Sequence, residues 1–281
     1  MSFLFNPDKA LHALRDEQPV LLMGRGHSGT RVLAYAVQML GVDLGFTKNT
    51  GTGDPIDKRF RGELARAARG WDVGDDPPLE DMRRLAKIIQ RWRTKNIKGS
   101  PWGWKYPECY LLIAHLNHIF PRAKYIHIIR DGRDLAFKHH RTSDPSTTLG
   151  RLLLTRIDAM HEPPHVQAAR SWAYQVNLFN EYAARMIPRE RRFETRFEDL
   201  CRDPVGETER IASFLGLKMD DETREFLTGH IKPEKISQHR DEQRGAIEDV
   251  EQAIGGTLRQ LGYEPGRTRT EAGQPAASPK A

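Results

Sequence analysis

Short, continuous apolar runs mark the strands that this chain is expected to form. Residues 19–24 read Pro-Val-Leu-Leu-Met-Gly, and residues 124–130 read Lys-Tyr-Ile-His-Ile-Ile-Arg. Runs of this kind, bounded by glycine or charge, are typical of strands buried on both faces of a parallel sheet. Residues 192–197 are a third candidate strand.

Between these runs, apolar residues recur at helical spacing. The pattern predicts helices over residues 30–40, 83–98, 134–141, 168–186, 204–215, 220–229 and 241–261. Residues 42–80, before the second helix, and residues 142–166 are irregular and are expected to be mostly loops. Strands that alternate with helices predict an α/β fold with a central, mostly parallel sheet flanked by helices.

The length of 281 residues suits one sizeable α/β domain, and the sequence shows no internal repeat or domain boundary. We expect a single domain over residues 1–265. Residues 266–281 are rich in glycine, proline, alanine and serine, so we expect a disordered tail there.

The charge and cysteine content exclude several classes of protein. Lysine and arginine exceed aspartate and glutamate by 44 to 38, a surplus that permits an anionic ligand but does not indicate a dedicated DNA-binding protein. No run approaches 18 consecutive apolar residues, and no signal peptide is apparent, so we expect no membrane span and a cytoplasmic location. Two cysteines without a CxxC pattern disfavour a disulfide framework and a thiolate zinc site.

The charges also lie in blocks. Residues 71–82 contain five acids and no base, whereas residues 83–98 contain seven bases and no acid. The basic helix predicted over 83–98 is either a solvated surface or a contact for an anionic acceptor such as a glycan, nucleotide or lipid headgroup. It has few interleaved aromatic residues, which argues against single-stranded nucleic acid.

A glycine-rich loop joins the first strand to the first helix. Residues 24–29 read Gly-Arg-Gly-His-Ser-Gly, which has the spacing of the first half of a P-loop. A nucleoside triphosphatase would continue with Lys and Ser/Thr for the phosphates and Mg²⁺, but Thr30 and Arg31 stand there. The loop therefore predicts an anion site without Mg²⁺, with Arg25 and His27 as candidate cations. A purely structural turn is the alternative.

The strand over 124–130 ends in Arg130, and Asp-Gly-Arg-Asp follows. Ligands of open α/β sheets bind at the carboxyl ends of the strands, and a guanidinium group suits bidentate contact with phosphate. The alternative is a structural Arg–Asp pair.

Together these motifs resemble the sulfotransferase family that uses 3′-phosphoadenosine 5′-phosphosulfate (PAPS). The family's phosphosulfate loop is similar to residues 26–31, its 3′-phosphate-binding strand and turn to residues 125–134, and its Arg-Tyr-Glu-Asp-Leu segment to residues 195–200. Trp-Lys-Tyr-Pro at 104–107 is a lesser match. The matches span residues 20–217 in the family's order.

The resemblance implies a P-loop-like fold and sulfuryl transfer from PAPS to a hydroxyl or amine, without a metal. The nucleotide-binding residues that it implies are Arg25, Gly26, His27, Ser28, Gly29, Thr30, Arg31, Arg130 and Lys138. Lys105 would stabilise charge on the bridging oxygen, with an ordinary surface lysine as the alternative. The candidates for the general base are Asp57, Glu108 and Asp54, in that order, and each could instead be a solvated carboxylate.

Two positions depart from the family's pattern. His27 stands where the family has Lys or Arg, so either His27 is protonated beside the anion or Arg25 takes over that role. Lys138 stands where the family has a serine, and we expect it to contact the 3′-phosphate, with a side chain that points into solvent as the alternative.

Other motifs carry less weight. Residues 161–165 match HExxH, but two central prolines disfavour the zinc-binding helix. His139 and His140 are expected at the surface. A P-loop small-molecule kinase and a non-catalytic anion-binding protein are the alternative functions. The acceptor is expected to be a small molecule, a glycan or a lipid headgroup, and the sequence does not indicate an oligomeric state.

Overall fold

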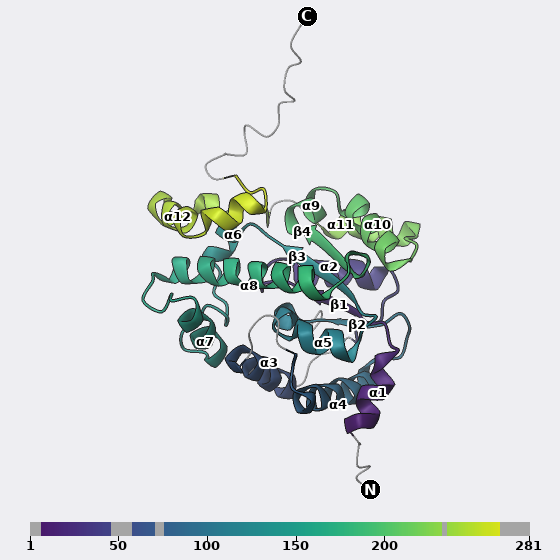
Figure 1. The fold of residues 1–281 in the computed structure, drawn as a ribbon. Coiled ribbons are helices and arrows are strands. Elements are labelled where there is room, and N and C mark those ends of the chain that lie inside the picture. The colour runs from purple at the N-terminus through teal and green to yellow at the C-terminus, as the bar shows by residue number, and fades with distance from the viewer. Residues whose placement is uncertain (1–6, 46–57, 71–75, 232–234, 265–281) are drawn as a thin grey trace, which may run out of the picture.

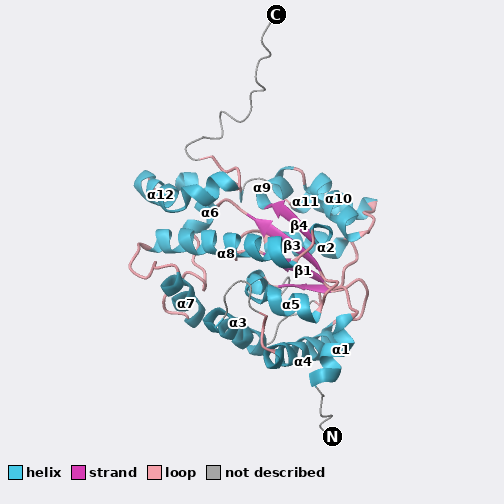
Figure 2. Cartoon of the chain, in the orientation of Figure 1, coloured by secondary structure: helices cyan, strands magenta, loops and turns pink. Residues whose placement is uncertain are grey.

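The computed structural model describes residues 7–45, 58–70, 76–231 and 235–264. Within them the chain forms a four-stranded parallel sheet of order β2-β1-β3-β4, covered by helices (Figures 1 and 2). Its strands are β1 (Val20–Met23), β2 (Gly103–Lys105), β3 (Lys124–Ile129) and β4 (Arg192–Arg196). The expected α/β fold with a parallel central sheet is confirmed. The expected tail at 266–281 and the candidate bases Asp54 and Asp57 lie outside the described residues.

The strands separate two cores because successive side chains point to opposite faces of a sheet. Leu21 and Met23 pack with the helices on one face, whereas Val20 and Leu22 pack on the other. The first face is covered by α1 (Pro7–Arg15), α3 (Lys58–Gly70), α4 (Leu79–Asn96), α5 (Ile113–Ile119), α7 (Thr148–Arg156) and α8 (Pro164–Met186). The second is covered by α2 (Thr30–Met39), α9 (Phe197–Arg202), α10 (Pro204–Leu215) and α11 (Asp221–His230).

The remaining elements lie close to the carboxyl ends of the strands or between larger elements. The short α6 (Gly132–Ala136) follows β3, and α12 (Arg244–Gln260) packs on α6 and α8. The 3₁₀ helices are η1 (Pro107–Leu112), η2 (Arg189–Arg191) and η4 (Gln238–Asp241). Within the described part of the chain, no helix is both long and apolar enough to span a membrane.

The structure differs from the predicted elements in several places, and α1 and α5 were not predicted. The helix expected over 134–141 is the five-residue α6, which begins earlier because the Asp131 side chain accepts a hydrogen bond from the Arg133 N–H. Two helices, α3 and α7, lie in segments expected to be loops. The long α8 begins at Pro164, since proline suits the first turn of a helix.

Candidate active site

The glycine-rich loop makes a tight turn between β1 and α2. The Ser28 N–H donates to the Arg25 carbonyl at 3.0 Å, and His27 and Gly29 adopt left-handed backbone conformations with φ of 70° and 90°. Gly29 is the N-cap of α2, with no side-chain cap hydrogen bond. Phe197 of α9 packs so closely there that a Cβ on Gly29 would lie 2.3 Å from its ring. The turn thus presents a helix N-terminus of the kind that binds anions.

Arg25 is a buried cation inside this loop, with 1% of its surface exposed. Its Nη1 donates to the Gly26 carbonyl at 3.0 Å, and its Nη2 lies 3.4 Å from the Lys138 carbonyl and the Ser143 hydroxyl. Burial lowers its pKa to about 10, so it is still charged at neutral pH. Within the described residues, Arg25 Nε and the buried Ser28 hydroxyl have no hydrogen-bond partner. Such atoms are costly unless a ligand satisfies them, so the loop fits an anion.

His27 is exposed at the tip of the same turn. Its Nε2 lies 3.1 Å from the His139 carbonyl, which can only accept, so Nε2 carries the hydrogen. Partial burial and the charge of Arg25 lower the pKa of His27. The imidazole is therefore neutral near pH 7 in the free protein, and its proposed role beside an anion stays a prediction.

Arg130 joins the end of β3 to the glycine loop. Its Nη1 donates to the His27 carbonyl at 3.2 Å, and its Nε and Nη2 donate to Asp134 Oδ2 at 3.2 and 3.0 Å. Its guanidinium lies 4.4 Å from the centre of the Phe197 ring. The two interpretations of this motif are thus compatible, because the Arg–Asp pair exists and lies directly beside the candidate anion site.

Residues 235–241 close this side of the site, and no sequence motif pointed to them. The Lys235 carbonyl accepts from Arg130 Nη2 at 2.6 Å. His239 donates to Asp134 Oδ1 from its backbone N–H at 3.0 Å and contacts it through Nδ1 at 2.6 Å. Burial favours a raised pKa for Asp134, but the hydrogen bonds of His239 and the charge of Arg130 outweigh it and lower the pKa.

The other predicted nucleotide-binding residues lie around the loop. Lys105 ends β2, beside Leu22 of β1, and is only 7% exposed, so it is not an ordinary surface lysine. Thr30 is buried in the first turn of α2 and Arg31 is exposed there. Lys138 is half-buried, and its charge is one of the causes that lower the pKa of His27.

Glu108 belongs to a buried charge cluster beside β2. Its carboxylate is 1% exposed and accepts from Arg141 Nε and Nη2, both at 2.7 Å. Arg141 also donates to the Tyr106 hydroxyl at 2.5 Å. Both oxygens of the Glu108 carboxylate are thus occupied by one guanidinium group in a bidentate pair. The role of Glu108 as general base stays a prediction, and its place in this cluster opposes it.

His140 lies at the site, and its expected position at the surface is wrong. His139 is exposed, but the His140 side chain is only 14% exposed. Its Nδ1 lies 2.7 Å from the Thr142 hydroxyl, its Nε2 lies 3.6 Å from Glu108, and a Cβ on Gly26 would lie 2.0 Å from Nε2. No local signal could reveal this, because α6 is short and the chain after it folds back against the loop.

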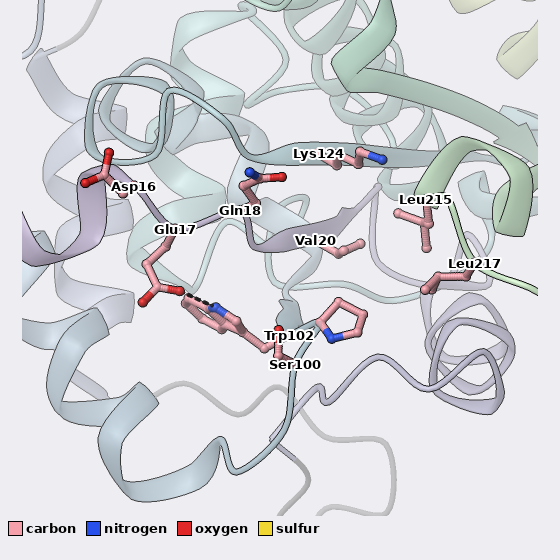
Figure 3. Close-up of a pocket in the computed structure, with 10 residues that line it drawn as sticks. Asp16, Glu17, Gln18, Val20, Ser100, Trp102, Lys124, Leu215 and Leu217 are labelled. Carbon is pink, nitrogen blue, oxygen red and sulfur yellow. Dashed lines mark hydrogen bonds between the residues drawn. The ribbon is translucent and has the colours of Figure 1, made fainter.

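Two other features lie away from this site. A cavity of about 430 Å³ opens at the amino ends of β1 and β3 (Figure 3), where Glu17 accepts from the Trp102 indole at 2.9 Å. None of the residues predicted for the site lines it. His161 precedes α8, so the HExxH segment does not form one helix, and the described residues contain no group of three or more potential metal ligands.

Comparisons with known proteins identify the family of the chain. A model of the "Sulfotransferase family" matches residues 54–221. The omega-hydroxy-beta-dihydromenaquinone-9 sulfotransferases Stf3 of Mycobacterium tuberculosis and Mycobacterium bovis are 28% identical over 181 residues, which cover 60% of this chain and 44% of theirs. The chain thus spans less than half the length of these curated relatives.

Among solved structures, the sulfotransferase domain from the curacin biosynthetic pathway is 15% identical, with a TM-score of 0.51, and the match covers 89% of this chain and 99% of that one. This similarity shows a shared fold. Mouse sulfotransferase SULT7A1, complexed with PAP, is 13% identical with a TM-score of 0.47, and the match covers 89% of this chain and 88% of that one.

Proposed function

This chain belongs to the sulfotransferase family, and we propose that it transfers a sulfuryl group from PAPS to a hydroxyl or amine of an acceptor. The observation that carries the proposal is the hydrogen bond from Arg130 to the His27 carbonyl. It joins the candidate 3′-phosphate residue to the candidate phosphosulfate loop at one edge of the sheet. Thr30 and Arg31 replace the Lys and Ser/Thr of a nucleoside triphosphatase, which favours PAPS over ATP–Mg²⁺.

The loop would hold the phosphosulfate end of the donor. The unpartnered Arg25 Nε and Ser28 hydroxyl, together with the N-terminus of α2 at Gly29 and Thr30, supply donors and positive potential there. Arg130 and Lys138 would hold the 3′-phosphate. Arg130 already donates to Asp134, so that carboxylate fixes the direction of the guanidinium.

The transfer needs positioning and charge stabilisation, by analogy with phosphoryl transfer. The acceptor oxygen forms a bond to sulfur while the bond from sulfur to the bridging phosphate oxygen breaks. PAP leaves with the electron pair of that bond, and the acceptor proton passes to a general base. The buried Lys105 would stabilise the charge that develops on the bridging oxygen, and His27 would assist it.

For the general base we propose Asp57 first, with Glu108 and Asp54 as further candidates. Asp54 and Asp57 lie outside the described residues, and Glu108 would have to be released from Arg141 before it could accept a proton. A hydroxyl acceptor requires such a base, because its proton must leave as the new bond to sulfur forms.

For the acceptor we propose a small molecule, a glycan or a lipid headgroup that carries a hydroxyl. The curated Stf3 relatives are named for an omega-hydroxy-beta-dihydromenaquinone, which is a hydroxyl-bearing small molecule. The chain covers less than half of those relatives, so their acceptor is not transferred to it.

The test is transfer of radiolabelled sulfate from PAPS to a mixed panel of alcohols, phenols, amines and glycans, with products identified by mass spectrometry. We expect labelled product with the wild-type protein and none with an Arg25→Ala, Arg130→Ala variant. A protein that binds PAP but labels no acceptor would support the non-catalytic alternative instead. Phosphorylated products formed from ATP–Mg²⁺ would support a kinase.

A further inference from the structure

Helices α3 and α7 lie side by side next to the candidate active site (Figure 1). Helix α3 also packs against η1, the 3₁₀ helix that contains Glu108. The Phe60 ring of α3 meets the Tyr106 ring edge-on, with centroids 5.3 Å apart, and the Tyr106 hydroxyl accepts from Arg141. The two helices therefore border the Glu108–Arg141 cluster, which lies next to the end of β2 at Lys105.

These two helices are strongly basic. Together they contain seven basic residues and one acidic residue, a net charge of +6 that equals the formal net charge of the whole chain. The basic residues are Lys58, Arg59, Arg61, Arg66, Arg69, Arg151 and Arg156. The one acid, Glu63, is 9% exposed and pairs with Arg66 and with Arg84 of α4, both at 3.5 Å.

Arg61, Arg69 and Arg151 are exposed and pair with no acidic residue of the described chain. Arg61 lies near the cluster, since its charge opposes the rise in pKa that burial and Glu108 cause at Tyr106. The basic helix predicted from the sequence, α4, differs from α3 and α7 because two of its arginines pair with acidic residues outside the helix. Its Arg83 pairs with Asp8 at 2.6 Å, and its Arg93 pairs with Glu17 at 2.7 Å.

We infer that the surface of α3 and α7 around Arg61 and Arg151 binds an anionic group of the acceptor, a phosphate or a carboxylate. This inference rests on the proposed function and specifies its acceptor class. Guanidinium groups recognise phosphate and carboxylate through paired hydrogen bonds. Arginines that pair with no acidic residue of the described chain also raise the concentration of anions near the candidate active site. An acceptor held there lies beside η1 and the Tyr106 ring, which directly follow Lys105 in the chain.

The test uses two matched pairs of acceptors with PAPS as donor. They are 4-nitrophenyl glucuronide against 4-nitrophenyl glucoside, and glucose 6-phosphate against glucose. The first pair tests a carboxylate and the second a phosphate. Sulfated products are quantified by mass spectrometry, and binding to the PAP complex is measured by calorimetry. The variant is R61E/R151E, and the control is K87E/K95E on α4, which changes the net charge equally.

We expect kcat/KM to be at least about tenfold higher for the anionic member of one pair, because charge-assisted contacts with exposed arginines are gained. The advantage is expected to shrink with added salt and to disappear in R61E/R151E, but not in K87E/K95E. Equal rates within both pairs, an advantage that survives R61E/R151E, or one lost equally in the control would overturn the inference. So would failure of both anionic probes to bind the PAP complex at about 10 mM.

Two further measurements distinguish acceptor binding from membrane binding and from failure of the donor site. If R61E/R151E left the matched pairs unchanged but abolished sedimentation with phosphatidylglycerol vesicles, the surface would bind membranes, and the inference would be overturned. PAP calorimetry on the same proteins separates the two proposals. Failure of the wild-type protein to bind PAP counts against the proposed function, whereas normal PAP binding without any anionic preference counts against this inference alone.

Discussion

Gly26 is the position in the glycine loop where one added methyl group has a well-defined consequence. A Cβ there would lie 2.0 Å from His140 Nε2 and 2.4 Å from Cδ2, far closer than the 3.0 Å that real Cβ atoms keep. The His140 ring cannot easily move away, because it is only 14% exposed and its Nδ1 is hydrogen-bonded to the Thr142 hydroxyl. Overpacking of this kind typically costs about 1–3 kcal/mol. We therefore expect Gly26→Ala to lower the free energy of unfolding by about that amount and to weaken PAP binding.

Urea denaturation and PAP calorimetry measure these effects, and a double-mutant cycle with His140→Ala assigns their cause. In the His140→Ala background the methyl group has room, so Gly26→Ala is expected to cost less than about 0.5 kcal/mol. Gly256→Ala in α12 is the control, because its Cβ meets nothing within 4 Å. That change is expected to stabilise the helix by about 0.5–1 kcal/mol.

The reasoning would be refuted by a Gly26→Ala protein as stable as the wild type. An equal loss of stability in the His140→Ala background would also refute it, since the clash could then not be with His140.

Three further predictions concern single residues. Arg130→Ala is expected to weaken PAP binding by about 1–3 kcal/mol in calorimetry, because charged hydrogen bonds are lost, and unchanged affinity would remove Arg130 from the nucleotide site. Asp57→Asn is expected to lower kcat for sulfate transfer by about 100-fold or more with unchanged PAP affinity, and a kcat near the wild-type value would pass the role to another carboxylate. Burial lowers the pKa of His115 from 6.5 to about 4, so the folded state binds fewer protons than the unfolded state and stability falls as the pH drops below 6.5. This loss reaches about 2 kcal/mol at pH 5, and in urea denaturation at pH 5 and 7 a His115→Asn variant should show a smaller difference than the wild type.

The sequence revealed the parts of this molecule that have local signals. The apolar runs of β1 and β3, the glycine spacing of the loop and the strand-end Arg130 are all encoded within a few neighbouring residues, and the structure has each strand where it was expected. Lys105 became a candidate only because residues 104–107 resemble a family motif, since β2 is three residues long and has no pattern of its own.

Features that depend on contacts between residues far apart in the chain could not be predicted from the sequence. In α3 the apolar residues Phe60, Leu64 and Ala67 have helical spacing, but arginine and glycine surround them, so the segment resembled a loop. The contact of His239 with Asp134 joins residues 105 positions apart. Likewise, Asp8 of α1 pairs with Arg83 of α4, and Glu17, which follows α1, pairs with Arg93 of α4. These pairs neutralise arginines that the sequence placed in a basic helix.

The central claim is that this chain binds a 3′-phosphorylated adenosine donor at the glycine loop without Mg²⁺. Calorimetry with PAP, compared with ATP–Mg²⁺ on the same protein preparation, tests it most directly. The account predicts that PAP binds more tightly than ATP–Mg²⁺ and with the same affinity in the presence of EDTA. Tighter binding of ATP–Mg²⁺ would contradict the account and favour a kinase.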